Sequence, residues 1–349
     1  MTEKPEEKFL QRCLDLGKSG AGNVSPNPMV GAVLVYEDAI IGEGFHEIYG
    51  GAHAEVNAFR QAEKLFANRI ADATLYVSLE PCSIFGKTPP CSDLIIEKKV
   101  KKVVVATLDQ TPEVNGNGVK KLSESGVEVN ITGGNLAVNE LSAIRNTFAA
   151  KNRPYVILKF AQSNDGFIGR AGEKIWLTNA FSKRLVHKWR SETDAIMIGT
   201  KTALTDDPEL TTRLYFGKSP VRILLDKNLI VPSNAKIFNS ASRTLVVTEK
   251  EIPSDNPAAE FLQLPFDENL LPTLLTELAK RKITSLLVEG GAKTIQAFLD
   301  KNLWDEARIF KTESNLSSGI QAPKIGLETF DTYQLLTDKI ERYRNFDPF

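Results

Sequence analysis

The sequence predicts an α/β protein built from two domains, and three observations support this prediction. Its 349 residues exceed the length that a single core usually organises. Short apolar runs alternate with amphipathic segments through both halves, a pattern typical of buried strands between helices that cover a sheet. A polar segment, Lys151–Pro154, interrupts this alternation near the middle. We therefore expect one domain over residues 1–150 and a second over residues 151–349.

The first half begins with a helix, because apolar residues recur at helical spacing over residues 9–16. Two strands are expected next, over 29–36 and 40–41, with a turn at Glu37 and Asp38 between them. The remaining elements alternate in type, with helices expected over 55–65, 94–98 and 119–125 and strands over 73–79, 103–107 and 127–131. Nearly continuous apolar strands between helices indicate a sheet that is covered on both faces.

The second half repeats the alternation of strands and helices without repeating the sequence. Strands are expected over 155–160, 195–198, 221–225, 245–248 and 285–288. Helices are expected over 182–190, 270–281 and 295–303, the first with Ser182 near its N-terminal cap. A second α/β domain follows from this pattern.

Composition and charge narrow the classes of partner. A formal net charge of −1 gives no electrostatic reason to expect nucleic acid. The first eight residues are charged and unlike a signal peptide, and no apolar run is long enough to span a membrane. Three cysteines are too few for a secreted disulfide framework and fit a reducing compartment. We expect a cytoplasmic enzyme of small molecules that forms a homo-oligomer.

One histidine and two cysteines form a candidate metal site. His53 precedes Glu55 by two residues, and Cys82 and Cys91 each follow a proline. Imidazole nitrogen and thiolate sulfur are zinc ligands, and three protein ligands leave the fourth tetrahedral position for water. A carboxylate beside that water can carry its proton to a departing amine. This order of residues is the signature of a zinc-dependent deaminase.

Two plainer interpretations of the same residues exist. A structural zinc site would leave Glu55 as a solvated helix residue, but such sites normally have four protein ligands and the sequence offers three. A chance combination is the other, since His-x-Glu and Pro-Cys are each common. Their joint order with a second Pro-Cys is far rarer, so the motif favours a catalytic zinc.

The spacing of the cysteines leads to a family resemblance. From Pro81 to Cys91 the sequence reads Pro-Cys-Ser-Ile-Phe-Gly-Lys-Thr-Pro-Pro-Cys, which is longer than the Pro-Cys-x-x-Cys of most zinc deaminases. With Pro26–Val33 and Gly44–His46, this segment resembles the bifunctional riboflavin-biosynthesis deaminase–reductase family. The resemblance implies a cytidine-deaminase-like three-layer α/β/α domain that deaminates a diamino-pyrimidinone ribosylamino 5′-phosphate. It implies zinc ligation by His53, Cys82 and Cys91, proton transfer by Glu55, and substrate contacts from Asn27, His46 and Lys87.

The second half carries weaker motifs of its own. No Gly-x-Gly-x-x-Gly follows a strand, but Glu289-Gly290-Gly291 lies between an expected strand and helix, where backbone amides can approach phosphate. The same tripeptide also suits an ordinary turn. The segments 158–159, 163–166, 176–178 and 206–213 extend the resemblance and imply a dihydrofolate-reductase-like domain that reduces the ribosylamino group with NADPH. The implied cofactor contacts are Ala161, Trp176, Thr202, Asp206 and Gly291, and the implied substrate contacts are Arg190, Leu210, Arg213 and Glu289.

The chain departs from the family pattern at several positions. Ile84 stands where the family commonly has histidine, and Lys174 where it has serine. Residues 308–314 replace a glycine-rich ending, and the tail over 341–349 has no family role. Two rival functions therefore stay open: a nucleoside or tRNA deaminase with an accessory domain, and a non-catalytic protein that binds a pterin-like or flavin-like ligand.

Overall fold

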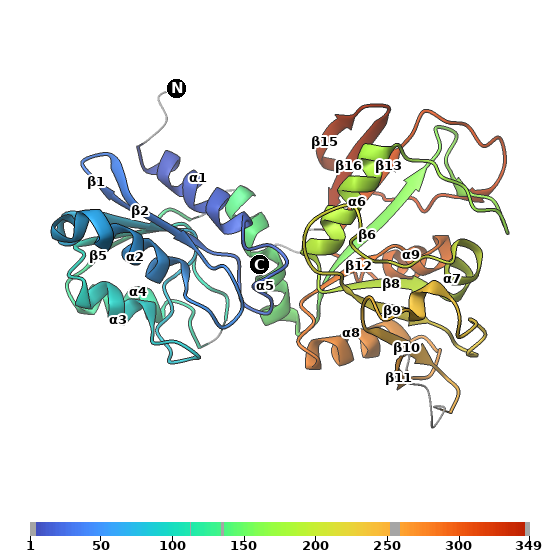
Figure 1. Ribbon diagram of the computed structural model, residues 1–349, viewed down its shortest axis with the longest axis horizontal. Coiled ribbons are helices and arrows are strands. Elements are labelled where there is room, and N and C mark those ends of the chain that lie inside the picture. Colours follow the sequence, from blue (N-terminus) through green and yellow to red (C-terminus); the bar gives the residue numbers. More distant parts are fainter. Residues whose placement is uncertain (1–4, 112, 134–135, 252–258, 346–349) are drawn as a thin grey trace. The chain divides into compact units, whose positions relative to one another are not determined.

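The computed structural model describes residues 5–111, 113–133, 136–251 and 259–345. The chain divides into two compact units, Met1–Arg153 and Pro154–Phe349 (Figure 1). Each unit has its own sheet and its own buried apolar clusters. Each is therefore a domain in the structural sense and is considered by itself below.

The N-terminal unit is built on a mixed sheet in the order β2-β1-β3-β4-β5. Its strands are β1 (Gly31–Tyr36), β2 (Ala39–Phe45), β3 (Thr74–Val77), β4 (Lys102–Val105) and β5 (Glu128–Ile131). β1 pairs antiparallel with β2 and β3, and β3, β4 and β5 run parallel. The hairpin between β1 and β2 turns at Glu37 and Asp38, which both adopt positive φ, as a tight two-residue hairpin turn requires.

Helices cover both faces of this sheet. Side chains alternate along β1, so that Ala32 and Leu34 pack in one apolar cluster and Val33 and Val35 in another. The first cluster includes α2 (Ala54–Phe66), α3 (Cys91–Glu97) and α4 (Asn117–Glu124), and the second includes α1 (Pro5–Lys18) and α5 (Leu136–Lys151). A 3-10 helix, η1 (Ala67–Asp72), follows α2. The three-layer α/β/α prediction is confirmed (Figure 1).

The C-terminal unit contains a larger sheet in the order β11-β10-β9-β8-β12-β6-β13-β16-β15. Its strands are β6 (Tyr155–Gln162), β8 (Ala195–Gly199), β9 (Val221–Leu225), β10 (Thr244–Thr248), β11 (Glu260–Gln263), β12 (Ser285–Val288), β13 (Glu306–Lys311), β15 (Thr329–Leu335) and β16 (Asp338–Arg344). The strands from β11 to β13 run parallel, and β16 and β15 add an antiparallel edge. β7 (Phe167–Gly169) and β14 (Ile320–Gln321) form a small separate ribbon.

Four helices of this unit connect the strands, within the part of the chain that the structure describes. They are α6 (Ala180–Glu192), α7 (Thr200–Asp206), α8 (Leu270–Lys280) and α9 (Ala292–Asp300), and a 3-10 helix, η2, spans Lys236–Phe238. Apolar side chains of α8 and α9, such as Leu274 and Phe298, share one buried cluster with β6, β8 and β12. Trp189 of α6 packs on Phe310 of β13, with ring centroids 5.3 Å apart.

The structure corrects several boundaries. Ser182 is not the cap of α6; the Asn179 side chain accepts from the backbone N–H groups of Phe181 and Ser182. Helix α9 begins at Ala292 rather than residue 295, and α5 was not expected at all. The tail over 341–349 begins within β16, and residues 346–349 lie outside the described residues. Among the described helices, none combines the length and apolar composition of a membrane span.

Candidate active sites

Helix α2 carries His53 at its N-cap and Glu55 in its first turn, and it lies unusually close to β2. A Cβ atom on Gly42 would come within 2.4 Å of the Ala58 carbonyl oxygen, and one on Gly44 within 2.5 Å of the Ala58 nitrogen. Only glycine leaves room for this approach. The two glycines of β2 therefore fix the depth at which the helix presents His53 and Glu55.

His53, Cys82 and Cys91 come together as one cluster, with ligand atoms all within 4.8 Å of one another. His53 Nδ1 lies 3.6 Å from Cys82 Sγ and 3.3 Å from Cys91 Sγ. Nitrogen and sulfur ligands of a tetrahedral zinc ion are about 3.6 Å apart, given Zn–N and Zn–S bonds of about 2.1 and 2.3 Å. The donor set and its spacing thus fit zinc.

The two cysteines do not titrate alike. Hydrogen bonds from the Cys91 side chain and from His53 lower the pKa of the Cys82 thiol to about 4, and the Cys91 backbone N–H, 3.3 Å from Cys82 Sγ, adds to this. The bond to Cys82 and burial raise the pKa of the Cys91 thiol. A divalent cation at this point would stabilise both thiolates, which is how metal binding releases protons.

Glu55 is buried, with 3% of its surface exposed, and burial raises the pKa of its carboxyl group. It therefore holds a proton more readily than an exposed glutamate does. A carboxyl group with these properties beside a metal-bound water suits a group that both accepts and returns a proton.

Asn27 and His46 form a polar pair next to the cluster. The Nδ1–H of buried His46 donates to the Ala52 carbonyl oxygen (2.9 Å), which leaves Nε2 to accept from Asn27 Nδ2 (3.1 Å). The His46 ring also meets the His53 ring edge-on at 5.3 Å. Burial lowers the pKa of His46, so the ring stays neutral and keeps the Asn27 amide in one orientation.

A cavity of about 240 Å³ opens over these groups. Its wall includes six of the predicted residues: Asn27, His46, His53, Glu55, Cys82 and Lys87. The Lys87 ammonium lies 4.0 Å from the centre of the Tyr49 ring, and the apolar side chain of Ile84 forms part of the same wall. Cys91 is buried at the first position of α3.

Other residues of this wall were not predicted from the sequence, including Tyr49, Glu80, Asp109 and Arg145. Glu80 accepts hydrogen bonds from the backbone N–H groups of Asp109, Gly116, Gly118 and Val119, and so ties the loop after β4 to the start of α4. No local motif marks these residues, because their role depends on contacts across 29 or more positions.

A second cavity, of about 360 Å³, lies in the C-terminal unit. It collects every residue that the sequence analysis assigned to the second reaction: Ala161, Trp176, Arg190, Thr202, Asp206, Leu210, Arg213, Glu289 and Gly291. Their roles remain predictions. Lys159 and His187 also line this cavity and were not among the assigned contacts; a lysine inside the apolar run of β6 was the available signal for Lys159.

The centre of this cavity is a nearly buried ion pair. Arg190 donates from Nε and Nη2 to the two oxygens of Glu289, each at 2.9 Å, and Lys159 Nζ lies 3.7 Å from Glu289 Oε2. Burial raises the pKa of Glu289, but Arg190 and Lys159 outweigh burial and lower it to about 2. Glu289 therefore occupies this edge of Arg190, a predicted substrate contact.

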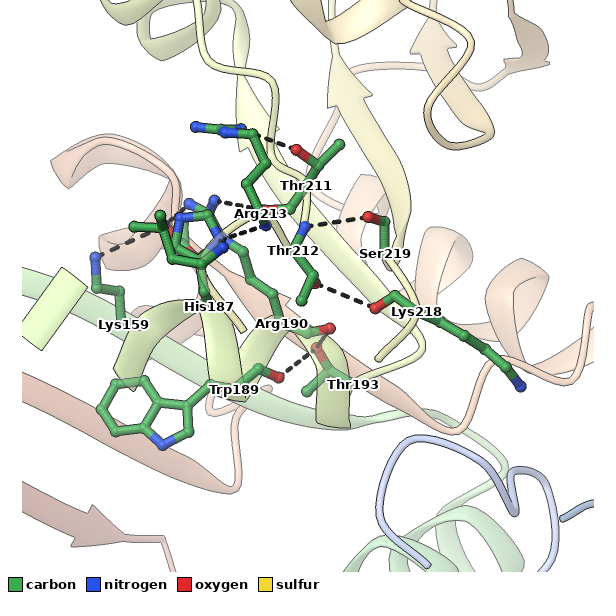
Figure 2. A network of polar contacts seen from close by, with 12 residues as sticks. Lys159, His187, Trp189, Arg190, Thr193, Thr211, Thr212, Arg213, Lys218 and Ser219 are labelled. Carbon is green, nitrogen blue, oxygen red and sulfur yellow. Dashed lines mark hydrogen bonds and ion pairs between the residues drawn. The ribbon is translucent and has the colours of Figure 1, made fainter. Parts of the chain in front are cut away.

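His187 holds the neighbouring loop (Figure 2). Its Nδ1 accepts from the backbone N–H of Arg213 at 2.9 Å, while Arg190 Nη1 donates to the Thr211 carbonyl oxygen at 3.3 Å. Burial, with the charges of Arg190 and Arg213, lowers the pKa of His187 to about 4. The Arg213 side chain bonds Glu209 and Thr211 through Nη1. Its Nε and Nη2 have no hydrogen-bond partner among the described residues.

The predicted cofactor contacts line the same cavity and include an exposed aromatic ring. Trp176 is 66% exposed, and the Lys183 ammonium lies 4.5 Å from its ring centre. Gly291, the N-cap of α9, approaches α7 so closely that a Cβ atom would lie 3.2 Å from Thr202 Oγ1. Lys174 Nζ donates to the Asp206 carbonyl oxygen at 2.6 Å. An exposed ring and the start of α9 in the wall of one cavity suit a planar, phosphate-bearing cofactor.

Comparison with known proteins accounts for both units. The cytidine and deoxycytidylate deaminase zinc-binding region matches residues 3–107, and the RibD C-terminal domain matches residues 154–312. The riboflavin biosynthesis protein RibD of Aquifex aeolicus is 38% identical over 95% of this chain and 93% of its own length. The chain belongs to the RibD family. RibD of Escherichia coli is 32% identical and covers 98% of this chain and 97% of its own.

Solved RibD structures agree with this assignment along the whole chain. A deaminase/5-amino-6-(5-phosphoribosylamino)uracil reductase from Thermotoga maritima is 36% identical, with a TM-score of 0.88 over 97% of this chain and 98% of that one. RibD of Acinetobacter baumannii is 32% identical, with a TM-score of 0.86 and the same coverage.

The family assignment settles the main function. The chain is a RibD-type bifunctional deaminase and reductase of riboflavin biosynthesis, and both catalytic domains are present. Zinc and NADPH, the predicted cofactors, are those of its two domains. Because the family spans both units, a nucleoside or tRNA deaminase with an unrelated accessory domain does not describe this chain.

Proposed function

We propose that the two cavities catalyse consecutive steps on one pyrimidine phosphate. The N-terminal unit converts the diamino-pyrimidinone ribosylamino 5′-phosphate to the aminouracil by exchanging an amino group for the oxygen of water. The C-terminal unit then reduces the ribosylamino group to ribitylamino with a hydride from NADPH and a proton. The observation that carries the proposal is the pairing, in one chain, of the His53–Cys82–Cys91 cluster beside Glu55 with the Glu289 ion-pair cavity.

In the first step, His53, Cys82 and Cys91 hold the zinc ion, which when bound supplies an acidified water. The Glu55 carboxylate would take up a proton and deliver it to the leaving amine, a role that its buried carboxyl suits. Asn27, oriented by neutral His46, pairs with the edge of the pyrimidine through its amide. Lys87 attracts the phosphate.

In the second step, Ala161, Trp176, Thr202, Asp206 and Gly291 bind NADPH, which when bound supplies the hydride. Arg213 takes the substrate phosphate, because two of its guanidinium nitrogens remain available on a loop fixed by His187. Arg190 and Leu210 line the substrate side, and Arg190 holds Glu289 as an ionised acceptor for substrate hydroxyl groups.

A coupled assay on zinc-loaded protein tests both steps. The pyrimidine phosphate is supplied with and without NADPH, and ammonia release and NADPH oxidation are followed separately. Ammonia without NADPH, followed by NADPH oxidation once it is added, is the expected result. Ammonia alone would refute the reductase assignment. If neither ammonia release nor NADPH oxidation occurs although one zinc is bound per chain, the result would favour the non-catalytic binding protein.

We further propose that the enzyme acts in the cytoplasm as a homo-oligomer and without nucleic acid. Three cysteines without a disulfide support the cytoplasm, and a net charge of −1 supports the absence of nucleic acid. Light scattering of the purified chain tests the oligomer, and a mass of 38.6 kDa would contradict it.

A further inference from the structure

Helix α5 contributes a charged side chain to the deaminase cavity. Arg145 lies in its middle and lines the cavity together with Glu55 and Lys87. The matched zinc-binding region ends at residue 107, well before this helix. The function described above leaves Arg145 without a role, although a guanidinium group in a catalytic cavity is a strong determinant of what binds there.

The side chain is held in place on one edge. Arg145 Nη2 donates to Thr111 Oγ1 at 2.7 Å. The Thr111 hydroxyl donates in turn to Asp109 Oδ1 at 2.5 Å, so its lone pairs are directed to the guanidinium. The Thr111 backbone N–H, 2.8 Å from the same oxygen, fixes this arrangement. A long side chain anchored in this way loses little further freedom when it binds a ligand.

The rest of the guanidinium group is not satisfied by the protein. Arg145 Nε is buried and has no hydrogen-bond partner in the described part of the chain. No ion pair of Arg145 occurs among the described residues either, although the same cavity wall includes Glu80 and Asp109. Those carboxylates are already engaged, Glu80 by backbone N–H groups and Asp109 by Thr111. A guanidinium group that lines a cavity and has no ion pair among the described residues suits an anionic ligand.

Charge and the departure at Ile84 point to the same conclusion. Lys87 and Arg145 are the cationic side chains that the described cavity wall contains. Lys87 is exposed and lies over Tyr49, so it forms only one side of an anion site. Ile84 removes the hydrogen-bonding histidine that the family commonly has in this loop, and its apolar side chain cannot bind an anion.

We propose that Arg145 binds the phosphate group of the deaminase substrate and so makes this site prefer phosphorylated over dephosphorylated pyrimidines. The inference rests on the deaminase function proposed above and adds a specificity-determining residue to it. Arg145 is not assigned any part in proton transfer; its contribution is to substrate binding.

The test compares phosphorylated and dephosphorylated substrate on the zinc-loaded full chain. Wild type, Arg145→Gln and Arg60→Gln are assayed for ammonia release; Arg60 is an exposed arginine of α2 outside the cavity wall and serves as the matched control. Arg145→Gln should raise KM for the phosphate ester about 10- to 100-fold, the range for a lost charge-assisted contact. We expect that Arg145→Gln leaves kcat for the phosphate ester, and KM for the dephosphorylated substrate, within about twofold of wild type.

For Arg145→Lys, KM for the phosphate ester should lie between the values for wild type and Arg145→Gln, because lysine keeps the charge and loses the paired hydrogen-bond geometry. Zinc content and NADPH oxidation confirm that each variant is folded. An equal rise in KM for both substrates would show a packing role and overturn the proposal, as would an unchanged KM for the phosphate ester.

Failure of the deaminase function can be told apart from failure of this inference. If wild type releases no ammonia, ribose 5-phosphate is titrated by calorimetry into Arg213→Gln protein, which lacks the proposed phosphate anchor of the reductase unit. Binding that Arg145→Gln abolishes in this background supports the phosphate site. Binding that Arg145→Gln leaves unchanged, or no binding to the parent protein, overturns it.

Discussion

The two cavities differ in how their charge is balanced. In the deaminase unit, two thiols and a buried carboxyl group lie beside His53, and a cation is needed before both thiols can ionise. In the reductase unit, Glu289 already has Arg190 and Lys159 as partners. The charges of the first site are therefore balanced only when the metal binds, whereas Glu289 in the second site is balanced by side chains of the protein. Loss of a component should damage them in different ways.

Glu55→Gln should have the largest effect on activity and almost none on stability. It removes the proton carrier while keeping the size of the side chain, so ammonia release should fall about 10²- to 10⁴-fold. NADPH oxidation with the aminouracil phosphate should be unchanged, because that reaction uses the other unit. Both signals are measured on the same preparation.

Removal of zinc by a chelator tests the same site as Glu55→Gln. It should abolish ammonia release as well, but it should also lower the unfolding temperature of the N-terminal unit, since Cys82 and the buried Cys91 lose the cation that stabilises their thiolates. A Glu55→Gln protein that retains one zinc and most of its ammonia release would contradict the proposed proton transfer.

In contrast to Glu55→Gln, Glu289→Gln should strongly lower the stability of its own unit and leave the deaminase reaction intact. It leaves Arg190 and Lys159 nearly buried without a counter-charge, which costs about 3–5 kcal/mol of unfolding free energy. Reductase activity should be lost and ammonia release retained. Glu260→Gln is the control, because its ion pairs with Arg243 and Arg281 are exposed and contribute about 1 kcal/mol or less. Equal effects of the two substitutions in denaturant titrations would refute the charge-balance comparison.

The sequence disclosed the first site better than the second for a physical reason. Metal ligation needs particular residue types at a few positions. The sequence itself shows these types and their spacing at His53, Cys82 and Cys91. The Arg190–Glu289 pair joins residues 99 positions apart and leaves no local trace. Helix α5, which adds Val138 and Leu141 to the core and Arg145 to the cavity wall, was not expected from the sequence.

Acid should weaken the reductase unit through His187. Its pKa is lowered to about 4 in the folded protein, against about 6.5 in an unfolded chain, so the unfolded state binds more protons between these values. The stabilisation is complete above pH 6.5 and is lost as the pH falls toward 4, by at most about 3 kcal/mol. His187→Asn keeps an acceptor near Arg213 and should flatten this dependence. A variant whose unfolding temperature falls as steeply as wild type over this range would exclude His187 as the cause.

Lys174→Ser, which restores the residue that the family commonly has, should have the smallest effect. Lys174 is exposed, and its ammonium group contacts the Asp206 carbonyl oxygen and lies 5.9 Å from the Trp176 ring centre. Loss of one such contact costs about 1 kcal/mol or less, so KM for NADPH should change less than about fivefold, with kcat unchanged. Trp176→Ala is the matched comparison, because the ring itself forms the cavity wall and its removal should weaken NADPH binding more. The charge balance of this cavity depends on the nearly buried Glu289 group rather than on exposed side chains at its rim. A larger change in KM for NADPH in Lys174→Ser than in Trp176→Ala would place the decisive charge at the surface. That result would overturn the charge-balance comparison between the two sites.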